Sequence, residues 1–330
     1  METLLEKYTE LNNSFKKTLV FHIGHNSGFF SEYNNMIFAM LFCLENNIKF
    51  TLYSGDANFK YSKGWEDYFE PFCEQRTEDF HHQYNVREIH DLTWIALSFI
   101  KRGYFPEKWF TNRMKYYAYL LRKKYFRSTY NFDYLTFDIW NDIRKNKKFA
   151  RKNFHIPELG INGDLQTACN VLVQLTWRYN AQTKTNIENL VKQLQLPNDY
   201  IGFHIRSGDK IKETNLYESQ KYIEKARTLS NTKNAFILTD DYQIIESFDK
   251  QYNVYTLCEK NESGYIHSEF EKNTPDQLRK SHEKLFASIE ALSQAEIFIG
   301  TFSSNPGTYL GMRMDKNKIF AVDYDNWDLR

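Results

Sequence analysis

Apolar and polar positions alternate along the chain with two different periods, most clearly in its C-terminal part. There, short apolar runs of strand length are separated by longer stretches in which apolar residues recur three or four positions apart, as on one helix face. The runs predict strands at residues 200–206, 235–239, 254–257, 296–300 and 319–323. The stretches between them predict helices at residues 217–227, 242–248 and 278–293, and a short helix that begins at Pro306. Strands that alternate with helices build a parallel, doubly wound sheet of the Rossmann type, whose ligands lie beyond the carboxyl ends of the strands.

The N-terminal part begins with a similar unit and then becomes helical. Its pattern gives a strand at 18–22, a glycine-bearing loop at 24–28, a helix at 33–45 and a strand at 49–53. This order is a β–α–β unit, which requires parallel strands. Residues 65–179 have a helical, irregular pattern. Because 330 residues suffice for two cores, we predict two domains, at residues 1–185 and 186–330.

Composition indicates a folded globular chain. Hydrophobic residues make up 42% and charged residues 26% of the sequence. The four cysteines are far apart in the sequence and form no Cys-x-x-Cys pair, so we expect reduced thiols and neither a zinc site nor a disulfide framework. The first apolar run, residues 18–23, is too short for a signal peptide, and no apolar run has the length of a membrane span. We therefore expect a cytoplasmic protein, or a soluble part of a longer one.

The net charge of +1 conceals a strong asymmetry along the chain. Residues 101–152 hold fifteen Lys or Arg against four Asp or Glu, a local charge of +11, so the rest of the chain carries −10. Aromatic residues lie between these bases. Such a surface suits an anionic membrane, for example the inner face of a cell membrane, a nucleic acid or an acidic glycan, and a solvated helical face is the structural alternative.

Three polar clusters follow three of the predicted C-terminal strands. They are His204–Lys210 (HIRSGDK), Thr239–Asp241 (TDD) and Thr301–Gly307 (TFSSNPG). Since the carboxyl ends of parallel strands meet at one edge of a sheet, we expect the clusters to converge there. Alternation along the first strand places His204 and Arg206 on the same face. A guanidinium at this strand tip can clamp a diphosphate with two hydrogen bonds, whereas an ion pair with Asp240 or Asp241 is the structural alternative.

The hydroxyl and acidic residues of these clusters each allow two interpretations. Ser303, Ser304 and Asn305 precede Pro306 at a helix start, where backbone N–H groups either bind a phosphate or are capped by side chains. Asp240 and Asp241 either hydrogen-bond nucleotide hydroxyls and orient Arg206, or cap the helix that follows them. Asp323–Tyr324–Asp325 has the Asp-x-Asp form of some metal sites. We interpret it as structural, so no metal site is predicted.

The order of HIRSGDK, LTDD and LSQAEIFIGTFSS resembles the three motifs of the α1,6-fucosyltransferases of core N-glycan and Nod-factor type. The His-x-Arg element is similar across the wider superfamily of GDP-fucose-dependent fucosyltransferases. The resemblance covers residues 165–321, and the loop 24–35 is loosely similar to the family's first glycine-bearing loop. It implies an α/β, GT-B-like fold in which two Rossmann-like domains face a cleft. Residues 1–185 would be the acceptor-side domain, with a helical, basic, aromatic-rich region, and residues 186–330 the nucleotide-sugar-binding domain.

Carried over position by position, the resemblance implies that Arg206 binds the β-phosphate of GDP and that His204 borders the nucleotide. The implied nucleotide-sugar site consists of His204, Arg206, Asp209, Asp240, Asp241, Thr301, Ser303 and Ser304. The implied catalytic residues are Arg206, Lys210 and Glu213, and Glu213 would take the proton from the acceptor hydroxyl. A first-turn acid exposed to solvent is the structural alternative for Glu213.

The sequence departs from the α1,6 pattern at four positions. Ser207 replaces a second arginine, Gly208 is more similar to the α1,2 group, and Ser288 replaces a base-reading aspartate. Glu213 lies three residues after Lys210, whereas the family glutamate lies four after its lysine. These departures leave the linkage and the recognition of guanine open.

The function implied by the resemblance is an inverting, metal-independent transfer of L-fucose from GDP-fucose to a glycan hydroxyl. Arg206 and the turn at 303–307 would replace a divalent metal as the electrostatic partner of the departing diphosphate. We expect no cofactor besides the donor, and an oligosaccharide or glycoconjugate as acceptor. A transferase for another GDP-sugar and a non-catalytic protein that binds nucleic acid or a membrane through residues 101–152 are the alternatives.

Overall fold

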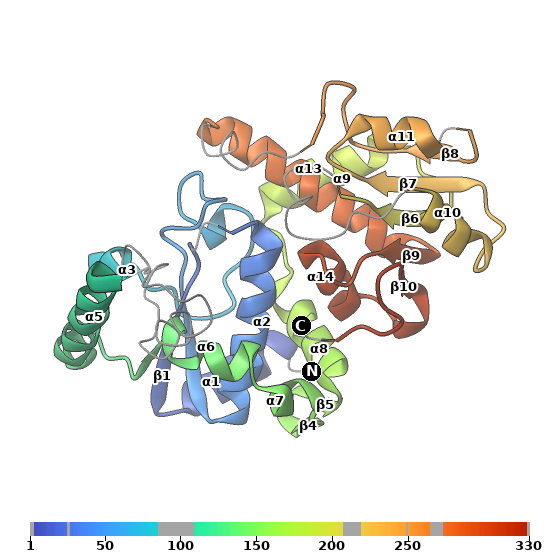
Figure 1. The fold of residues 1–330 in the computed structure, drawn as a ribbon. Helices are drawn as coiled ribbons and strands as arrows, with labels where there is room; N and C mark the ends of the chain where they lie inside the picture. Colours follow the sequence, from blue (N-terminus) through green and yellow to red (C-terminus); the bar gives the residue numbers. More distant parts are fainter. Residues whose placement is uncertain are drawn as a thin grey trace.

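The computed structural model describes residues 3–24, 27–84, 109–206, 219–248, 250–264 and 273–328. Within these ranges the chain forms two separate parallel sheets with helices around and between them (Figure 1). This arrangement confirms the predicted α/β class.

The N-terminal sheet has the strand order β2-β1-β3, and all of its strands are parallel. Its elements are α1 (Leu4–Ser14), β1 (Lys17–His22), α2 (Phe29–Glu45), β2 (Ile48–Tyr53) and β3 (Tyr134–Leu135). The predicted β–α–β unit is confirmed, although α2 begins four residues earlier than expected. The early start is stabilised by Glu32 in the first turn, whose carboxylate accepts hydrogen bonds from the backbone N–H groups of Gly24 and Ser27.

The segment between the two sheets is mainly helical, as its pattern predicted. Its elements are η1 (Trp65–Asp67), α3 (Asp79–Tyr84), α5 (Trp109–Thr129), α6 (Thr136–Arg144), α7 (Lys147–Arg151), β4 (Phe154–Ile156), η2 (Pro157–Leu159), β5 (Ile161–Gly163), α8 (Leu165–Thr176) and α9 (Ala181–Gln193). The hairpin of β4 and β5 is antiparallel and small. The predicted boundary at 185/186 falls inside α9, which packs on α13 of the C-terminal part, and that boundary stays a prediction.

The C-terminal sheet has the order β10-β9-β6-β7-β8, and every pairing in it is parallel. Its elements are β6 (Ile201–His204), α10 (Ser219–Arg227), β7 (Asn234–Leu238), α11 (Tyr242–Phe248), β8 (Asn253–Tyr255), α13 (Pro275–Gln294), β9 (Ile297–Gly300), α14 (Asn305–Arg313), η4 (Lys316–Lys318) and β10 (Ile319–Ala321). The five strands and four helices predicted from the pattern are all present, with bounds shifted by a few residues.

Side-chain alternation along β6 is also confirmed. Ile201, Phe203 and Ile205 belong to the core on one face of the sheet. On the other face, a Cβ at Gly202 would come within 2.9 Å of the Leu292 side chain, so a glycine lets α13 lie directly on the strand.

A single large core joins the two halves of the chain. It includes side chains of α2, α8, α13 and α14, and Figure 1 shows α2, α8 and α14 between the two sheets. All four cysteines are free thiols, as expected. No helix among the described residues has both the length and the apolar character that a membrane span requires.

Candidate functional site

The strand order of the C-terminal sheet creates a topological switch point between β6 and β9. From the central strand β6 the chain runs outward through β7 and β8, then crosses to β9 and β10 on the other side. The chain segments that follow β6 and β9 therefore run in opposite directions. In doubly wound sheets, ligands bind in the crevice between two such segments. The first and third predicted polar clusters follow these two strands.

His204 and Ser304 meet across the switch point. The Nδ1 atom of His204, at the end of β6, lies 3.4 Å from Oγ of Ser304, the N-cap of α14. The Ser304 hydroxyl donates to the Thr301 carbonyl at 2.8 Å and accepts from the Gly307 N–H at 3.1 Å. Because its only proton is used in this way, the hydroxyl can only accept from His204, which favours the tautomer with hydrogen on Nδ1.

His204 is held as a neutral imidazole. Its side chain is buried, and burial together with the positive charge of Arg206 lowers the pKa of His204 to about 3. Arg206 lies two residues beyond β6 and is half-buried. The structure therefore brings His204 and Ser304 of the first and third clusters together, and Arg206 lies close enough to His204 for its charge to act on the ring.

The turn before α14 is fixed by Asp323 as well as by Ser304. The two carboxylate oxygens of Asp323 accept the backbone N–H groups of Phe302 and Ser303, each at 2.9 Å. Asp323, the first aspartate of the Asp-x-Asp motif, therefore has the structural role that we predicted for this motif. These two amides are occupied within the chain, and between residues 302 and 307 the Asn305 N–H is the one amide that donates to no described residue.

The turn also requires a glycine at position 307. A Cβ there would lie 1.9 Å from the Thr301 carbonyl oxygen, so no other residue allows the backbone to close in this way. The sequence signal for this turn, Ser-Asn-Pro-Gly, thus has a steric basis.

The second polar cluster, after β7, caps a helix. The Asp241 carboxylate accepts the Gln243 N–H at 3.0 Å in the first turn of α11, and the Thr239 hydroxyl accepts the Asp241 N–H at 3.2 Å. The carbonyl of Asp240 accepts the Gly264 N–H at 2.6 Å. We interpreted these acids either as nucleotide-binding residues or as helix caps, and within the chain Asp241 caps α11.

Several predicted site residues lie outside the described ranges. They are Asp209, Lys210 and Glu213, in the segment 207–218, which also contains Ser207 and Gly208, two of the departures from the α1,6 pattern. Ser288 is described: it is buried in α13, and its hydroxyl donates to the Lys284 carbonyl of its own helix. Its hydroxyl proton is thus already used inside the helix, at the position where the α1,6 pattern has a base-reading aspartate.

The N-terminal half contributes a contact that the motifs did not predict. The amide of Asn34, on α2, donates to the Asn305 carbonyl at 2.9 Å and so connects the glycine-bearing loop region to the start of α14. The Oδ1 atom of Asn34 is buried and accepts no hydrogen bond within the described chain. The signal for this contact in the sequence was a polar residue within the apolar pattern of α2.

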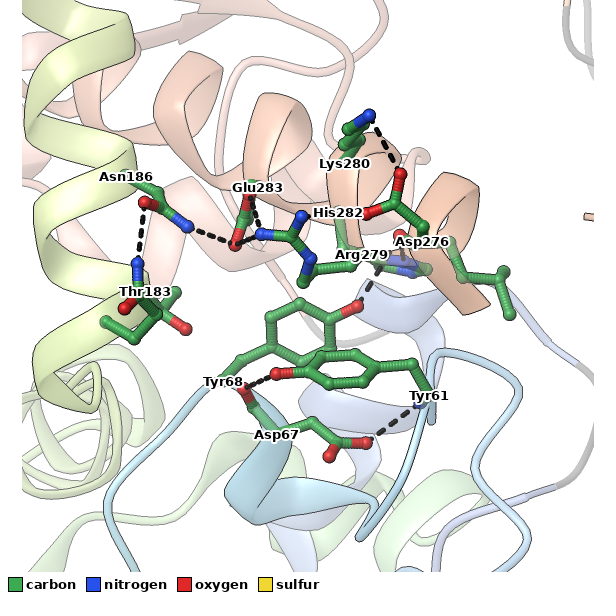
Figure 2. A network of polar contacts seen from close by, with 12 residues as sticks. Tyr61, Asp67, Tyr68, Thr183, Asn186, Asp276, Arg279, Lys280, His282 and Glu283 are labelled. Atoms are coloured by element: carbon green, nitrogen blue, oxygen red, sulfur yellow. Dashed lines mark hydrogen bonds and ion pairs between the residues drawn. The ribbon is translucent and has the colours of Figure 1, made fainter. Parts of the chain in front are cut away.

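A second polar network holds the two halves together at the start of α13. The carboxylate of Asp67 accepts the backbone N–H groups of four consecutive residues, Tyr61, Ser62, Lys63 and Gly64. Tyr61 and Tyr68 lie between this loop and the first turns of α13, where the Tyr68 hydroxyl donates to the Leu278 carbonyl at 3.4 Å (Figure 2).

The network continues to α9 through a buried carboxylate. Glu283 accepts hydrogen bonds from the Asn186 amide at 2.7 Å and from the Arg279 guanidinium at 3.4 Å (Figure 2). Since these residues come from three distant segments, no local motif predicts them. They fix α13, which covers β6, relative to the N-terminal half.

No metal site accompanies this geometry in the described part of the chain. Within those ranges, no three His, Cys, Asp or Glu side chains are grouped so that they could hold a metal ion.

Comparison with known proteins connects this site with a family. A family model described as alpha-(1,6)-fucosyltransferase N- and catalytic domains matches residues 168–307, which include β6, β7, β9 and the turn before α14. No curated protein matches the chain significantly.

Three solved structures are similar to this chain. A NodZ alpha-1,6-fucosyltransferase, from a crystal soaked with GDP-fucose, has a TM-score of 0.50 and 12% identity, over 91% of this chain and 93% of that chain. Fucosyltransferase NodZ from Bradyrhizobium has a TM-score of 0.48 and 13% identity, over 89% of this chain and 92% of that chain. FUT1 from Arabidopsis thaliana has a TM-score of 0.48 and 12% identity, over 92% of this chain and 71% of that chain. The fold shared with the first of these and the family model confirm the predicted resemblance to the fucosyltransferase superfamily, with the α1,6 type as the matching model.

Proposed function

We propose that this protein is a glycosyltransferase that transfers L-fucose from GDP-fucose to a hydroxyl of a glycan. The observation that carries the proposal is the contact of His204 with Ser304 at the switch point between β6 and β9, within the residues 168–307 that match the α1,6-fucosyltransferase model. NodZ, which has the same fold, was crystallised and soaked with GDP-fucose. The donor would bind beyond β6 and β9, with its diphosphate between Arg206 and the start of α14.

The leaving group would be stabilised by fixed positive charge and not by a cation. Arg206 supplies a permanent charge, and α14 presents the positive end of its dipole together with the Asn305 N–H. Both carboxylate oxygens of Asp323 are already occupied by backbone amides, which argues against a metal-binding role for the Asp-x-Asp motif. We therefore propose turnover that continues in excess EDTA.

Inversion follows from in-line displacement of GDP by the acceptor oxygen. One base is needed, and Glu213, or another acid in the segment 207–218, would take the acceptor proton as the bond to the sugar forms. His204 is a poor base, because its lowered pKa leaves a weakly basic ring. Its role would be to position the turn and to present a neutral ring to the nucleotide.

A donor-hydrolysis assay with purified protein tests the proposal. Release of the nucleoside diphosphate is measured for GDP-fucose, GDP-mannose and UDP-galactose, because the occupied Ser288 hydroxyl leaves guanine recognition to other residues. We expect release from GDP-fucose alone, with and without EDTA. Release from GDP-mannose in place of GDP-fucose would support the other GDP-sugar, and no release from any donor would contradict the proposal.

Two substitutions of Arg206 distinguish, in the same assay, the effect of its charge from the effect of its hydrogen-bond geometry. Arg206→Lys keeps the charge but loses the two parallel hydrogen bonds, so it should already slow turnover strongly. Arg206→Ala should be slower still, by about two to three decades, since one electrostatic donor to a transition state contributes about 3 to 4 kcal/mol. Arg227→Lys, an exposed arginine on α10 that donates to Gln251, is the matched control and should retain turnover. Near-normal turnover of Arg206→Ala would make Arg206 a structural residue.

A further inference from the structure

The helix α5 presents an apolar stripe to solvent, which is the reverse of the usual orientation of a surface helix. Met114, Tyr117, Leu121 and Tyr125 recur at spacings of three and four residues and lie on one face. All four are exposed; Leu121 is 71% and Tyr125 72% accessible. Single exposed apolar residues need no explanation, but a contiguous row of large ones marks an interaction surface.

The opposite face of α5 is the one that holds the helix to the protein. Phe126 packs on Phe80 and Tyr130 with ring centroids 4.9 Å and 5.5 Å apart. Lys123 donates to the Asp138 carboxylate at 2.5 Å. Because these contacts fix the rotation of the helix, the apolar stripe cannot turn inward without breaking them.

Charge on α5 has one sign. The sequence from Trp109 to Thr129 contains six Lys or Arg and no Asp or Glu. Arg122 and Lys124 are exposed and flank the apolar stripe on its two sides. This helix lies within the stretch 101–152 that carries +11, while the rest of the chain carries −10. The occupant of the surface must therefore offer apolar contact and negative charge together.

We propose that α5 docks this protein on an anionic lipid bilayer, with Leu121 and Tyr125 inserted at the level of the headgroups. A helix with an apolar, aromatic stripe flanked by Lys and Arg is the form that lies in the plane of a membrane interface. Tyrosine suits this depth because its ring is apolar and its hydroxyl stays hydrated. The inference goes beyond the transfer reaction and does not depend on it.

The other occupants fit the residues less well. A nucleic acid would use the basic residues but gains nothing from exposed Leu121 and Met114, which do not interact with phosphate. A second copy of the chain, joined through the same face, would place two helices of like charge against each other. In Figure 1, α5 lies at the outer edge of the N-terminal half, remote from the C-terminal sheet, so a flat surface can reach it without obstructing the β6–β9 edge.

Co-sedimentation with vesicles tests the proposal. The wild-type protein is mixed with phosphatidylcholine vesicles and with vesicles that also contain phosphatidylglycerol. We expect binding to the anionic vesicles only. Raising the salt from about 0.1 M to about 1 M, which shortens the Debye length from about 10 Å to about 3 Å, should weaken binding strongly.

Paired variants assign the binding to α5. The double change Leu121→Ser and Tyr125→Ser should weaken binding about tenfold or more, because it removes the inserted side chains. Lys124→Glu should weaken it by roughly twentyfold, since it changes the charge by two and each basic residue near the surface contributes about fivefold. The controls are Tyr324→Ser and Lys192→Glu, the same chemical changes at exposed positions outside α5. Donor hydrolysis in solution and thermal melts should be unchanged in the α5 variants, which shows that they are folded.

Three outcomes would overturn the proposal. Absence of selective binding to anionic vesicles is the first, and undiminished binding of the α5 variants is the second. The third is a wild-type dimer that binds no vesicles and becomes monomeric on Leu121→Ser, which would assign the stripe to a second copy of the chain.

Discussion

The ion pair of Glu290 and Arg313, whose side chains are 16% and 22% exposed, is joined by Trp177 and Tyr179 of the N-terminal half, and its removal has a calculable cost. Glu290 is on α13 and Arg313 ends α14, while Trp177 and Tyr179 directly follow α8. One carboxylate oxygen, Oε1, accepts from Trp177 Nε1 at 2.8 Å, from the Tyr179 hydroxyl at 2.9 Å and from Arg313 at 2.9 Å. Among the described residues, the other oxygen, Oε2, accepts only from Arg313, at 2.6 Å.

Burial by itself would raise the pKa of Glu290, but the Arg313 guanidinium and the two neutral donors outweigh burial and lower that pKa. The carboxylate is therefore ionised in the folded protein. In Glu290→Gln, the amide oxygen must replace Oε1, where three donors converge. Its NH2 group then faces the Arg313 guanidinium, donor against donor, at a position where the native contact is 2.6 Å.

Glu290→Gln thus leaves a largely buried arginine without its charge partner and places two donors in contact. Breaking a fully buried pair in this way costs about 3 to 5 kcal/mol, so we expect a loss of up to that size, a large share of a typical stability of about 5 to 15 kcal/mol. Arg313→Met should cost a similar amount. The double variant should cost clearly less than the sum, with a coupling energy of about 2 kcal/mol or more, because it leaves no unpaired charge.

Urea denaturation followed by circular dichroism and by tryptophan fluorescence measures these energies. Glu188→Gln is the matched control, since its pair with Lys184 is exposed and long at 4.0 Å, and it should change stability by less than about 0.5 kcal/mol. A loss below about 1 kcal/mol for Glu290→Gln, or additive effects in the double variant, would refute the reasoning.

Two further predictions concern the site and the pH dependence of stability. Gly307→Ala places a Cβ 1.9 Å from the Thr301 carbonyl and should open the turn, with a loss of about 1 to 3 kcal/mol and of donor hydrolysis, whereas Gly28→Ala, whose Cβ meets nothing within 4 Å, should keep its stability in the same urea titration. Burial lowers the pKa values of His81, His204 and His282 to about 4, 3 and 4, so the unfolded chain binds more protons below pH ~6.5. Stability should therefore fall as the pH falls from about 6.5 to about 4, by up to about 1.4 kcal/mol per pH unit for each histidine. Urea midpoints that stay constant over that range would contradict this.

The C-terminal sheet could be predicted from the sequence because its signals are local. Each strand is a short apolar run, and the start of α14 has its own cap, Ser304, two residues before Pro306. The position of His204 followed from simple alternation along β6. These features depend on residues close in sequence, which is the information that periodicity and capping contain.

The parts that the sequence did not predict depend on contacts without a periodic signal, some of them between distant segments. In the sequence, Asn34 is a polar residue that interrupts an apolar helix pattern. Only the structure shows its contact with Asn305 of α14, which lies 271 residues later in the chain. Asp67 reads as a surface acid, although it organises a loop that meets α13. Glu32 and Asp323 likewise hold backbone amides that only the folded chain brings near them. A carboxylate that accepts backbone N–H groups leaves no periodic signature, so such residues are visible only in three dimensions.

Helix α14 shows why a boundary drawn along the chain does not separate the physical units of this protein. Its N-terminal turn belongs to the β6–β9 edge, but the carbonyl of its first residue, Asn305, accepts from Asn34 of the N-terminal half. At its other end, Gln166 of α8 donates to the Gly311 carbonyl at 2.6 Å, and Asn170 of α8 donates to the carbonyls of Met312 and Arg313, both at 2.9 Å. These are end carbonyls of the kind that a helix cannot satisfy internally. The N-terminal half therefore holds both ends of the helix whose first turn forms the proposed phosphate site, and a shift between the halves must move that turn relative to His204.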